Sequence, residues 1–129
     1  MKNINTSITK DNFSDFFNKF DREDLSIQIK KLISNMQKKL VFKIKILNAS
    51  IHFTKENKIF SACGFRRKQN YFLIEFFSKT KINNIRILKE IKNKYTEKNE
   101  FIINRIEIRK ENDIDDELIE WICNSYNLV

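Results

Sequence analysis

The chain has 129 residues, of which 41% are hydrophobic and 33% are charged, and its formal net charge is +8 at pH 7. This length suits one domain with a single hydrophobic core, and with no proline, repeat or linker we place one domain over residues 1–129. No apolar run approaches the roughly 20 residues that a membrane span needs, and the N-terminus lacks the apolar block of a secretory signal. We therefore expect a soluble, cytoplasmic protein with no membrane association.

Basic side chains are concentrated in the middle of the chain. Residues 30–110 hold 21 Lys and Arg against six Asp and Glu, a net charge of +15, whereas residues 111–129 hold six acidic and no basic side chains. Lys, Ile and Asn are abundant throughout, as AT-rich codon usage gives, so part of this charge reflects composition. The remainder favours an acidic partner such as nucleic acid.

Helical spacing predicts two helices near the N-terminus. The first is short and carries phenylalanines at i, i+3, i+4 and i+7, namely Phe13, Phe16, Phe17 and Phe20. The second follows an acidic run at residues 21–24, which suits the first turn of a helix because the helix dipole favours negative charge there. Its apolar stripe consists of Leu25, Ile29, Leu32, Ile33, Met36 and Leu40.

Four or five strands with short connections follow. Alternating apolar and polar residues predict strands at 42–46 and 51–54 and, less regularly, at 100–109, and two further strands are expected at 59–65 and 71–77, joined by residues 66–70. The strand at 71–77 is apolar on both faces except at Glu75, which is typical of a central strand that is covered on both sides. Burial of a lone carboxylate is costly, so we expect Glu75 to pair with a Lys or Arg of a neighbouring strand, or to lie at the sheet edge.

Two segments remain after these strands. Residues 85–95 fit either a helical turn or a strand. At the C-terminus, Asn112 or Asp113 should cap a helix whose apolar residues are Ile114, Leu118, Trp121, Ile122 and Tyr126. Short connections favour antiparallel pairing. We therefore predict an α+β fold, a mainly antiparallel sheet of four to five strands with two N-terminal helices and one C-terminal helix packed on it.

The usual catalytic patterns are missing. A single glycine, Gly64, excludes glycine-rich dinucleotide and phosphate loops, and we expect it to permit a close backbone approach or a bulge. Cys63 and Cys123 lack metal-ligand spacing, so we expect reduced, structural thiols and neither a metal nor a cofactor. His52 and Cys63 fall on adjacent strands, where they would form a nucleophilic dyad; the alternative is a solvent-facing histidine beside a buried cysteine.

Carboxylates in the segment before the last helix are a further candidate site. Their spacing distributes them around the start of a helix, where they favour the dipole, rather than bringing them together for acid–base or metal chemistry; they are Asp113, Asp115, Asp116, Glu117 and Glu120. We therefore expect no enzymatic activity from this chain.

Basic residues around two connections are the better candidate for a binding site. Arg66, Arg67 and Lys68 lie in the connection at 66–70, and the neighbouring strands are flanked by Lys43, Lys45, Lys55 and Lys58. If these turns share one end of the sheet, they form a positive patch that contacts phosphates without reading sequence. Tyr71 or Phe65 would then add base stacking. The alternative is a solvated, lysine-rich surface that keeps the protein in solution.

Several of these segments also carry a family resemblance. Phe65-Arg66-Arg67, Tyr71-Phe72, the run at 113–118, Trp121 and Tyr126 resemble motifs of a family of small bacterial domains, the domain-of-unknown-function family numbered fifty-six fifty-five, also labelled "predicted transport protein". The similarity spans roughly residues 23–129 and leaves out the first helix. Asn104 stands where members often carry a histidine, so an activity that needs that histidine is not expected here.

The resemblance implies an α+β fold and brings no established activity. Members occur alone or fused to nuclease and restriction-type proteins, which implies a nucleic-acid or defence setting. Two functions are therefore predicted. The first is a non-catalytic basic module that contacts nucleic acid or a nucleic-acid-handling protein, such as a nuclease or defence complex. The second is a protein–protein interaction factor, for instance an inhibitor or accessory subunit in phage defence or anti-defence. A ligand site or weak enzyme around His52, Cys63 and Glu75 is a third alternative.

Overall fold

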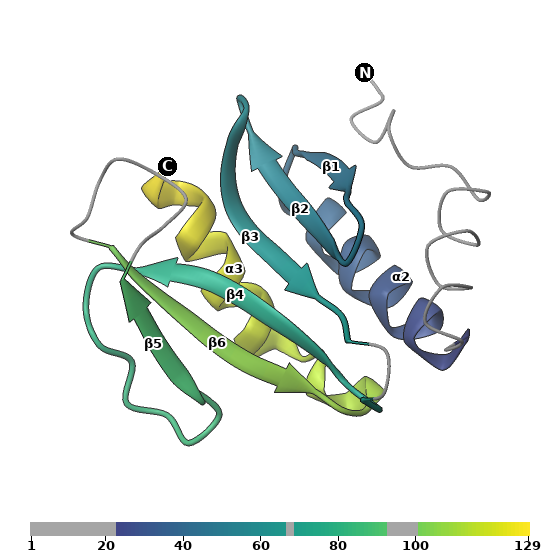
Figure 1. Cartoon of the computed structure of the whole chain (residues 1–129). Helices are drawn as coiled ribbons and strands as arrows, with labels where there is room; N and C mark the ends of the chain where they lie inside the picture. The colour runs from purple at the N-terminus through teal and green to yellow at the C-terminus, as the bar shows by residue number, and fades with distance from the viewer. Residues whose placement is uncertain (1–22, 67–68, 93–100) are drawn as a thin grey trace.

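The computed structural model describes residues 23–66, 69–92 and 101–129 (Figure 1). The helix expected around Phe13–Phe20 and the basic residues Arg67 and Lys68 lie outside these ranges. In chain order the described elements are α2 (Glu23–Gln37), β1 (Lys43–Ile46), β2 (Ser50–Lys55), β3 (Lys58–Gly64), β4 (Phe72–Ser78), β5 (Lys89–Lys92), β6 (Ile102–Ile108), the 3-10 helix η1 (Glu111–Asp113) and α3 (Asp116–Leu128). None of these helices is long and apolar enough to cross a membrane.

The strands form one antiparallel sheet in the order β1-β2-β3-β4-β6-β5, which confirms the predicted α+β class. The sheet has six strands, so the expected number of four to five was too low. The additional strand is β5, which comes from the ambiguous segment at 85–95. β5 is an edge strand that pairs only with β6. It has four residues, which are too few to show a clear alternation of apolar and polar side chains.

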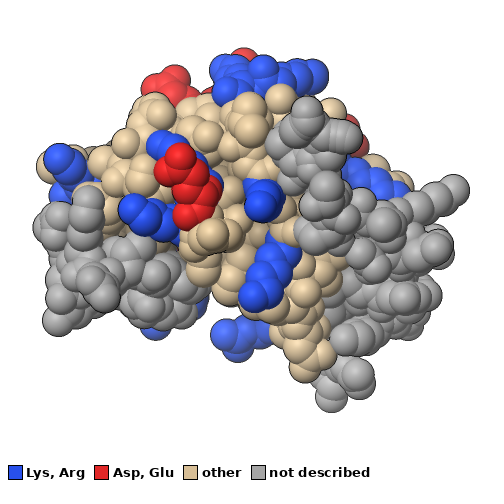
Figure 2. Space-filling model, turned by 90° about the horizontal axis from the view of Figure 1, so that it is seen from above, with Lys and Arg blue, Asp and Glu red and all other residues tan. Residues whose placement is uncertain are grey.

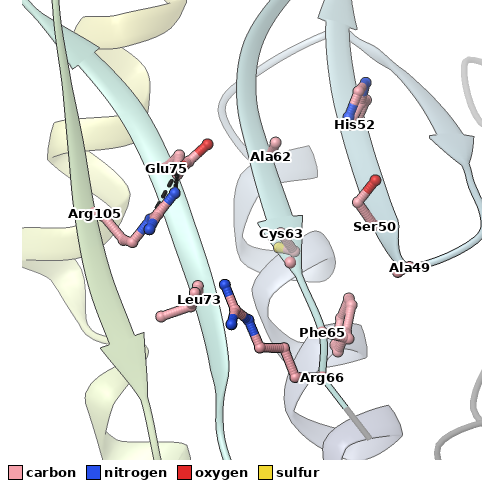
Figure 3. A pocket seen from close by; sticks show the side chains of 11 residues that line it. Ala49, Ser50, His52, Ala62, Cys63, Phe65, Arg66, Leu73, Glu75 and Arg105 are labelled. Carbon is pink, nitrogen blue, oxygen red and sulfur yellow. Dashed lines mark hydrogen bonds and ion pairs between the residues drawn. The ribbon is translucent and has the colours of Figure 1, made fainter. Parts of the chain in front are cut away.

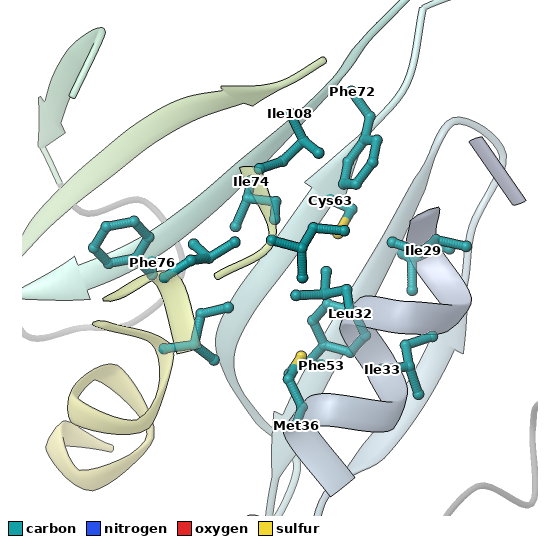
Figure 4. Packing of buried hydrophobic residues seen from close by; sticks show 14 of the residues in the cluster. Ile29, Leu32, Ile33, Met36, Phe53, Cys63, Phe72, Ile74, Phe76 and Ile108 are labelled. Atoms are coloured by element: carbon teal, nitrogen blue, oxygen red, sulfur yellow. The ribbon is translucent and has the colours of Figure 1, made fainter. Parts of the chain in front are cut away.

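Both described helices pack against the same face of the sheet (Figure 1). The predicted stripe of α2 is buried there, together with alternate residues of the strands such as Phe53, Ile74 and Phe76 (Figure 4). β4 lies at the centre of the sheet, as expected. On its opposite face Glu75 and Phe77 are also buried, so β4 is largely covered on both sides, as expected, although no described helix lies over the centre of that face.

The N-cap of α3 lies two residues after Asp113 and three after Asn112, the two caps that the sequence suggested. Asp115 is the N-cap, with extended backbone (φ −121°, ψ 179°) and a side chain that accepts a hydrogen bond from the Leu118 N–H at 3.0 Å. The Asp113 carboxylate instead accepts from the backbone N–H groups of Arg109 and Lys110. Asp113 therefore stabilises the 3-10 turn before α3 and does not cap the helix itself. The run contains several acids that could cap α3, so the sequence alone did not show which of them does.

A bulge in β3 changes how the sheet meets α3. The register between β2 and β3 shifts at Phe53/Thr54, which leaves Phe60 as an extra residue whose ring joins the core. Beyond this point β3 and β4 separate (Figure 1). The buried Ser125 hydroxyl on α3 bridges them, donating to the Phe60 carbonyl at 2.5 Å and accepting from the Phe77 N–H at 2.8 Å. Two backbone groups that the ladder leaves unpaired are thus satisfied by the helix.

Candidate functional site

The face of the sheet opposite α2 and α3, here called the open face, carries a cross-strand row of side chains that are polar at every position but one. The register places one residue from each strand side by side, so that their side chains point to the same face. From one sheet edge to the other, this cross-strand row is Lys45, His52, Ala62, Glu75, Arg105 and Lys89.

An ion pair at the centre of the cross-strand row neutralises its acidic member. Arg105 donates from Nε and Nη2 to Glu75 Oε2, at 2.9 Å and 2.5 Å. The two side chains are only 22% and 10% exposed, so the pair is largely shielded from water. Glu75 thus pairs with an arginine of a neighbouring strand, as expected, and it lies at the centre of the sheet rather than at its edge. The lysines at the two ends of the row therefore leave it positively charged.

A groove of about 200 Å³ runs along β3 on the open face (Figure 3). Its floor is formed by Ala62 and Gly64, the residues of β3 that face this side. His52 and Ser50 of β2 stand on one side, and the other side and the lower end are formed by Leu73, Glu75, Arg105 and Arg66. The groove exists because small residues on one strand lie between larger side chains on its two neighbours.

Gly64 itself has neither of the roles that we expected for it. Its φ is not positive, the bulge lies elsewhere, and a Cβ built on it would meet no atom within 4 Å. No backbone therefore approaches closely enough to require a glycine. The physical consequence of having no side chain at this position is an open floor in the groove, which is one of the uses of glycine within a strand.

The predicted basic residues are not gathered at one end of the sheet. Lys58 follows the β2–β3 hairpin turn, and Arg66 follows the other end of β3, about 20 Å away for a seven-residue strand. Lys43 and Lys45 lie exposed on the edge strand β1. Seen from above, Lys and Arg form several separate groups rather than one patch (Figure 2). The shared-end condition for the predicted patch is therefore not met.

The two predicted stacking residues are both engaged by other side chains. Phe65 is buried and stacks on Phe72, with ring centroids 5.4 Å apart, so it belongs to the core. The guanidinium of Arg109 lies over the Tyr71 ring, 4.3 Å from its centroid, and also donates to Glu107 at 2.7 Å. Neither ring is presented for base stacking without a rearrangement.

The conceivable Cys–His dyad does not form. His52 pairs with Ala62 on the open face, whereas Cys63 pairs with Ile51 and points into the core between the sheet and α2 (Figure 4). Burial raises the pKa of the Cys63 thiol well above its usual value, which keeps it protonated and a poor nucleophile. The residues are neighbours along the sheet, but the alternation of β-strands places them on opposite faces.

The acidic run before α3 has a structural use, as expected. Burial acts to raise the pKa of Asp115, but hydrogen bonds from the Leu118 N–H and from Arg86 outweigh it and lower that pKa. Arg86 donates to Asp115 at 3.0 Å and to the Asp113 carbonyl at 2.6 Å, so the β4–β5 loop is fixed to the start of α3. Within the described ranges, no group of three or more His, Cys, Asp or Glu side chains could hold a metal ion.

Sequence reasoning missed two residues of this architecture. Arg105 was assigned only to a strand, although it stands in register with Glu75. Asn104, on the opposite face, is fully buried and donates to the Ser78 hydroxyl at 2.9 Å. The alternation along one strand shows which of its residues share a face of the sheet. It does not show which residue of another strand lies beside each of them, because that depends on the register between strands, here 30 residues apart in sequence.

Comparisons with family models, with curated proteins and with solved structures found no match for this chain. The resemblance to the domain-of-unknown-function family numbered fifty-six fifty-five gains no support from them and stays a prediction.

Proposed function

We propose that this chain is a non-catalytic binding module whose open face contacts the phosphate backbone of nucleic acid. The observation that carries the proposal is the cross-strand row, which holds Lys45, Lys89 and Arg105 and only one acid, Glu75, which Arg105 already neutralises. Such an arrangement attracts a polyanion over the whole width of the sheet.

Other charged residues add to the positive charge of the open face or leave it unchanged. Lys43 lies beside Lys45 on β1 and faces the same side, and Arg66 stands at the end of the groove. Glu107, two residues after Arg105 on β6, is bound by Arg109 and adds little free negative charge. Phosphate contacts of this kind give affinity without sequence readout, so we expect binding with little sequence preference.

Protection of the sheet edges is the competing explanation for some of these lysines. Both edge strands have four residues, and lysines on short edge strands discourage pairing with another chain. This explanation accounts for Lys43, Lys45 and Lys89. It does not account for Arg66 or for a groove between polar walls in the middle of the sheet.

Binding of labelled single- and double-stranded DNA and RNA at low and moderate salt tests the proposal. We compare Lys43→Gln/Lys45→Gln with Lys38→Gln/Lys39→Gln, which removes the same charge from exposed lysines after α2. If both β1 lysines contact phosphates, the first variant reduces the slope of log K against log salt by about 1.5 and the control leaves it unchanged. Equal losses in both variants, or no binding by the wild type at low salt, would contradict the proposal.

One observation favours a second function, the docking of a partner protein. In the β4–β5 loop, Ile85 is 97% exposed and Leu88 is 54% exposed, while Arg86 between them is fixed to α3. The loop therefore presents apolar side chains from a defined position, as interface anchors require. Co-purification from the native host that is lost with Ile85→Asp and kept with Lys81→Asp, an exposed control in the same loop, would support it.

A further inference from the structure

We infer that the nucleic acid is bound as a single strand that lies along β3 in the groove over Ala62 and Gly64, with a phosphate held by Arg66. This inference rests on the proposed function and specifies its substrate class. Its basis is the shape of the groove, the position of Arg66 and the absence of a side chain at Gly64.

The width of the groove selects one strand rather than two. β2 and β4 flank β3 on its two sides, so their backbones are about 9.6 Å apart, twice the spacing between neighbouring strands. The side chains of His52 and Glu75 narrow the opening further (Figure 3). A single sugar–phosphate chain fits such a space, whereas a duplex, whose major groove alone is about 12 Å wide, touches only the rims.

Charge and hydrogen-bond donors are placed for a phosphate. The Arg66 guanidinium extends over Leu73 from the lower end of the groove toward the Glu75–Arg105 pair (Figure 3). Among the described residues, no hydrogen bond or ion pair to its guanidinium is seen. Arginine binds phosphate through two parallel N–H groups, and Arg66 can offer them, whereas the guanidinium of Arg105 on the wall beyond it already donates to Glu75.

The sugar and base of the bound strand require the open floor. A side chain at position 64 would extend into the groove, because Gly64 lines it and an added Cβ meets no atom within 4 Å. Position 64 therefore offers a test that does not depend on charge. Because its φ is not positive and an added Cβ meets no atom, valine fits the backbone there and suits a strand.

The experiment measures binding of a single-stranded and a double-stranded oligonucleotide to full-length wild type, Gly64→Val, Arg66→Gln and Ser34→Val. Ser34 is exposed on α2 and provides a control for added apolar volume away from the groove. We expect Gly64→Val to weaken single-strand binding about tenfold or more and to leave duplex binding within about twofold. Arg66→Gln should reduce the single-strand salt slope by about 0.7. Ser34→Val should behave as wild type.

Ala62→Leu, which fills the same floor from the other residue, replaces Gly64→Val if that variant unfolds more easily than wild type. Unchanged single-strand affinity in a folded, filled variant would overturn the inference; if Lys43→Gln/Lys45→Gln still weakens binding, the proposed function stands without it. A wild type that binds neither form of nucleic acid would overturn the proposed function and the inference together.

Discussion

The two faces of the sheet use the same strands for different purposes. On β4, Phe72, Ile74 and Phe76 are buried against the helices, while Leu73 and Glu75 between them line the groove on the open face. An antiparallel sheet can have one face in the core and one in solvent, because alternate side chains point to opposite sides. Residues that are adjacent in sequence can therefore serve stability on one face of the sheet and binding on the other.

The separation is not complete, because one end of the open face is apolar. Phe77 and Ile103 pair across β4 and β6, on the same side as Glu75, and both are buried in a small second cluster with Phe101. The polar part of the open face therefore follows the cross-strand row from Lys45 to Lys89, and along β4 and β6 it ends at this cluster. A bound strand that follows β3 stays on the polar part.

Truncation on the two faces of β4 gives the largest expected contrast. Ile74 is 0% exposed, so Ile74→Ala removes buried atoms and leaves a cavity, which lowers the free energy of unfolding by about 2–5 kcal/mol. The neighbouring Leu73 is half-buried in the groove wall, and we expect Leu73→Ala to cost about 1 kcal/mol. Urea denaturation of both variants measures this contrast. Equal losses would show that the open face is as much a part of the core as the other.

Removal of one hydroxyl on the helix-covered face should have the next largest effect. In Ser125→Ala, the Phe60 carbonyl and the Phe77 N–H lose their bridge, and buried backbone groups without partners cost about 1–3 kcal/mol. Ser34→Ala, at an exposed position of α2, is the matched control and should change stability by less than about 0.5 kcal/mol. If Ser125→Ala and Ser34→Ala lower the free energy of unfolding equally, the Ser125 hydroxyl does not join β3 to β4 as described.

Features that depend on residues close together in sequence were predicted correctly, whereas features that depend on contacts between distant segments were not. The stripe of α2 and the alternation in β1 and β2 were predictable, since the period of apolar residues along a segment indicates which of them are buried. The Glu75–Arg105 pair, the Ser125 bridge and the groove were not, because each joins segments that only the register and the packing of α3 bring together. Gly64 was noticeable as the one glycine, yet its effect depends on which neighbours flank β3.

We expect the open face to contribute to the stability of the fold through the Glu75–Arg105 ion pair. Arg105→Met keeps the length of the side chain but leaves the Glu75 carboxylate poorly hydrated without this partner, so we expect a loss of about 1–2 kcal/mol at about pH 7. Arg109→Met, which breaks an exposed pair with Glu107, is the control and should cost less than about 1 kcal/mol in urea denaturation. Equal losses in the two variants would show that the burial of the Glu75–Arg105 pair does not increase its contribution to stability.

The smallest expected effect is a pH dependence of stability that arises from Cys63, on the helix-covered face. Burial raises the pKa of the Cys63 thiol in the folded protein, while its open-face neighbours Ala62 and Gly64 have no titrating group. Below the unfolded-state pKa of about 8.5, the thiol is protonated in both states and the contribution is constant. Above it, the unfolded chain loses the proton and the folded protein keeps it, so stability falls as the pH rises.

Wild type should therefore lose about 1 kcal/mol more than Cys63→Ala between about pH 8 and pH 9.5, as measured by urea denaturation at each pH. Cys123 is the control, because burial also raises its pKa, with opposing influences from Lys39 and Glu120, but its side chain is only partly buried. We expect Cys123→Ala to keep most of the wild-type pH dependence. The reverse result, with the pH dependence lost in Cys123→Ala and kept in Cys63→Ala, would mean that Cys63 reaches solvent and that the division between the two faces of β3 does not hold.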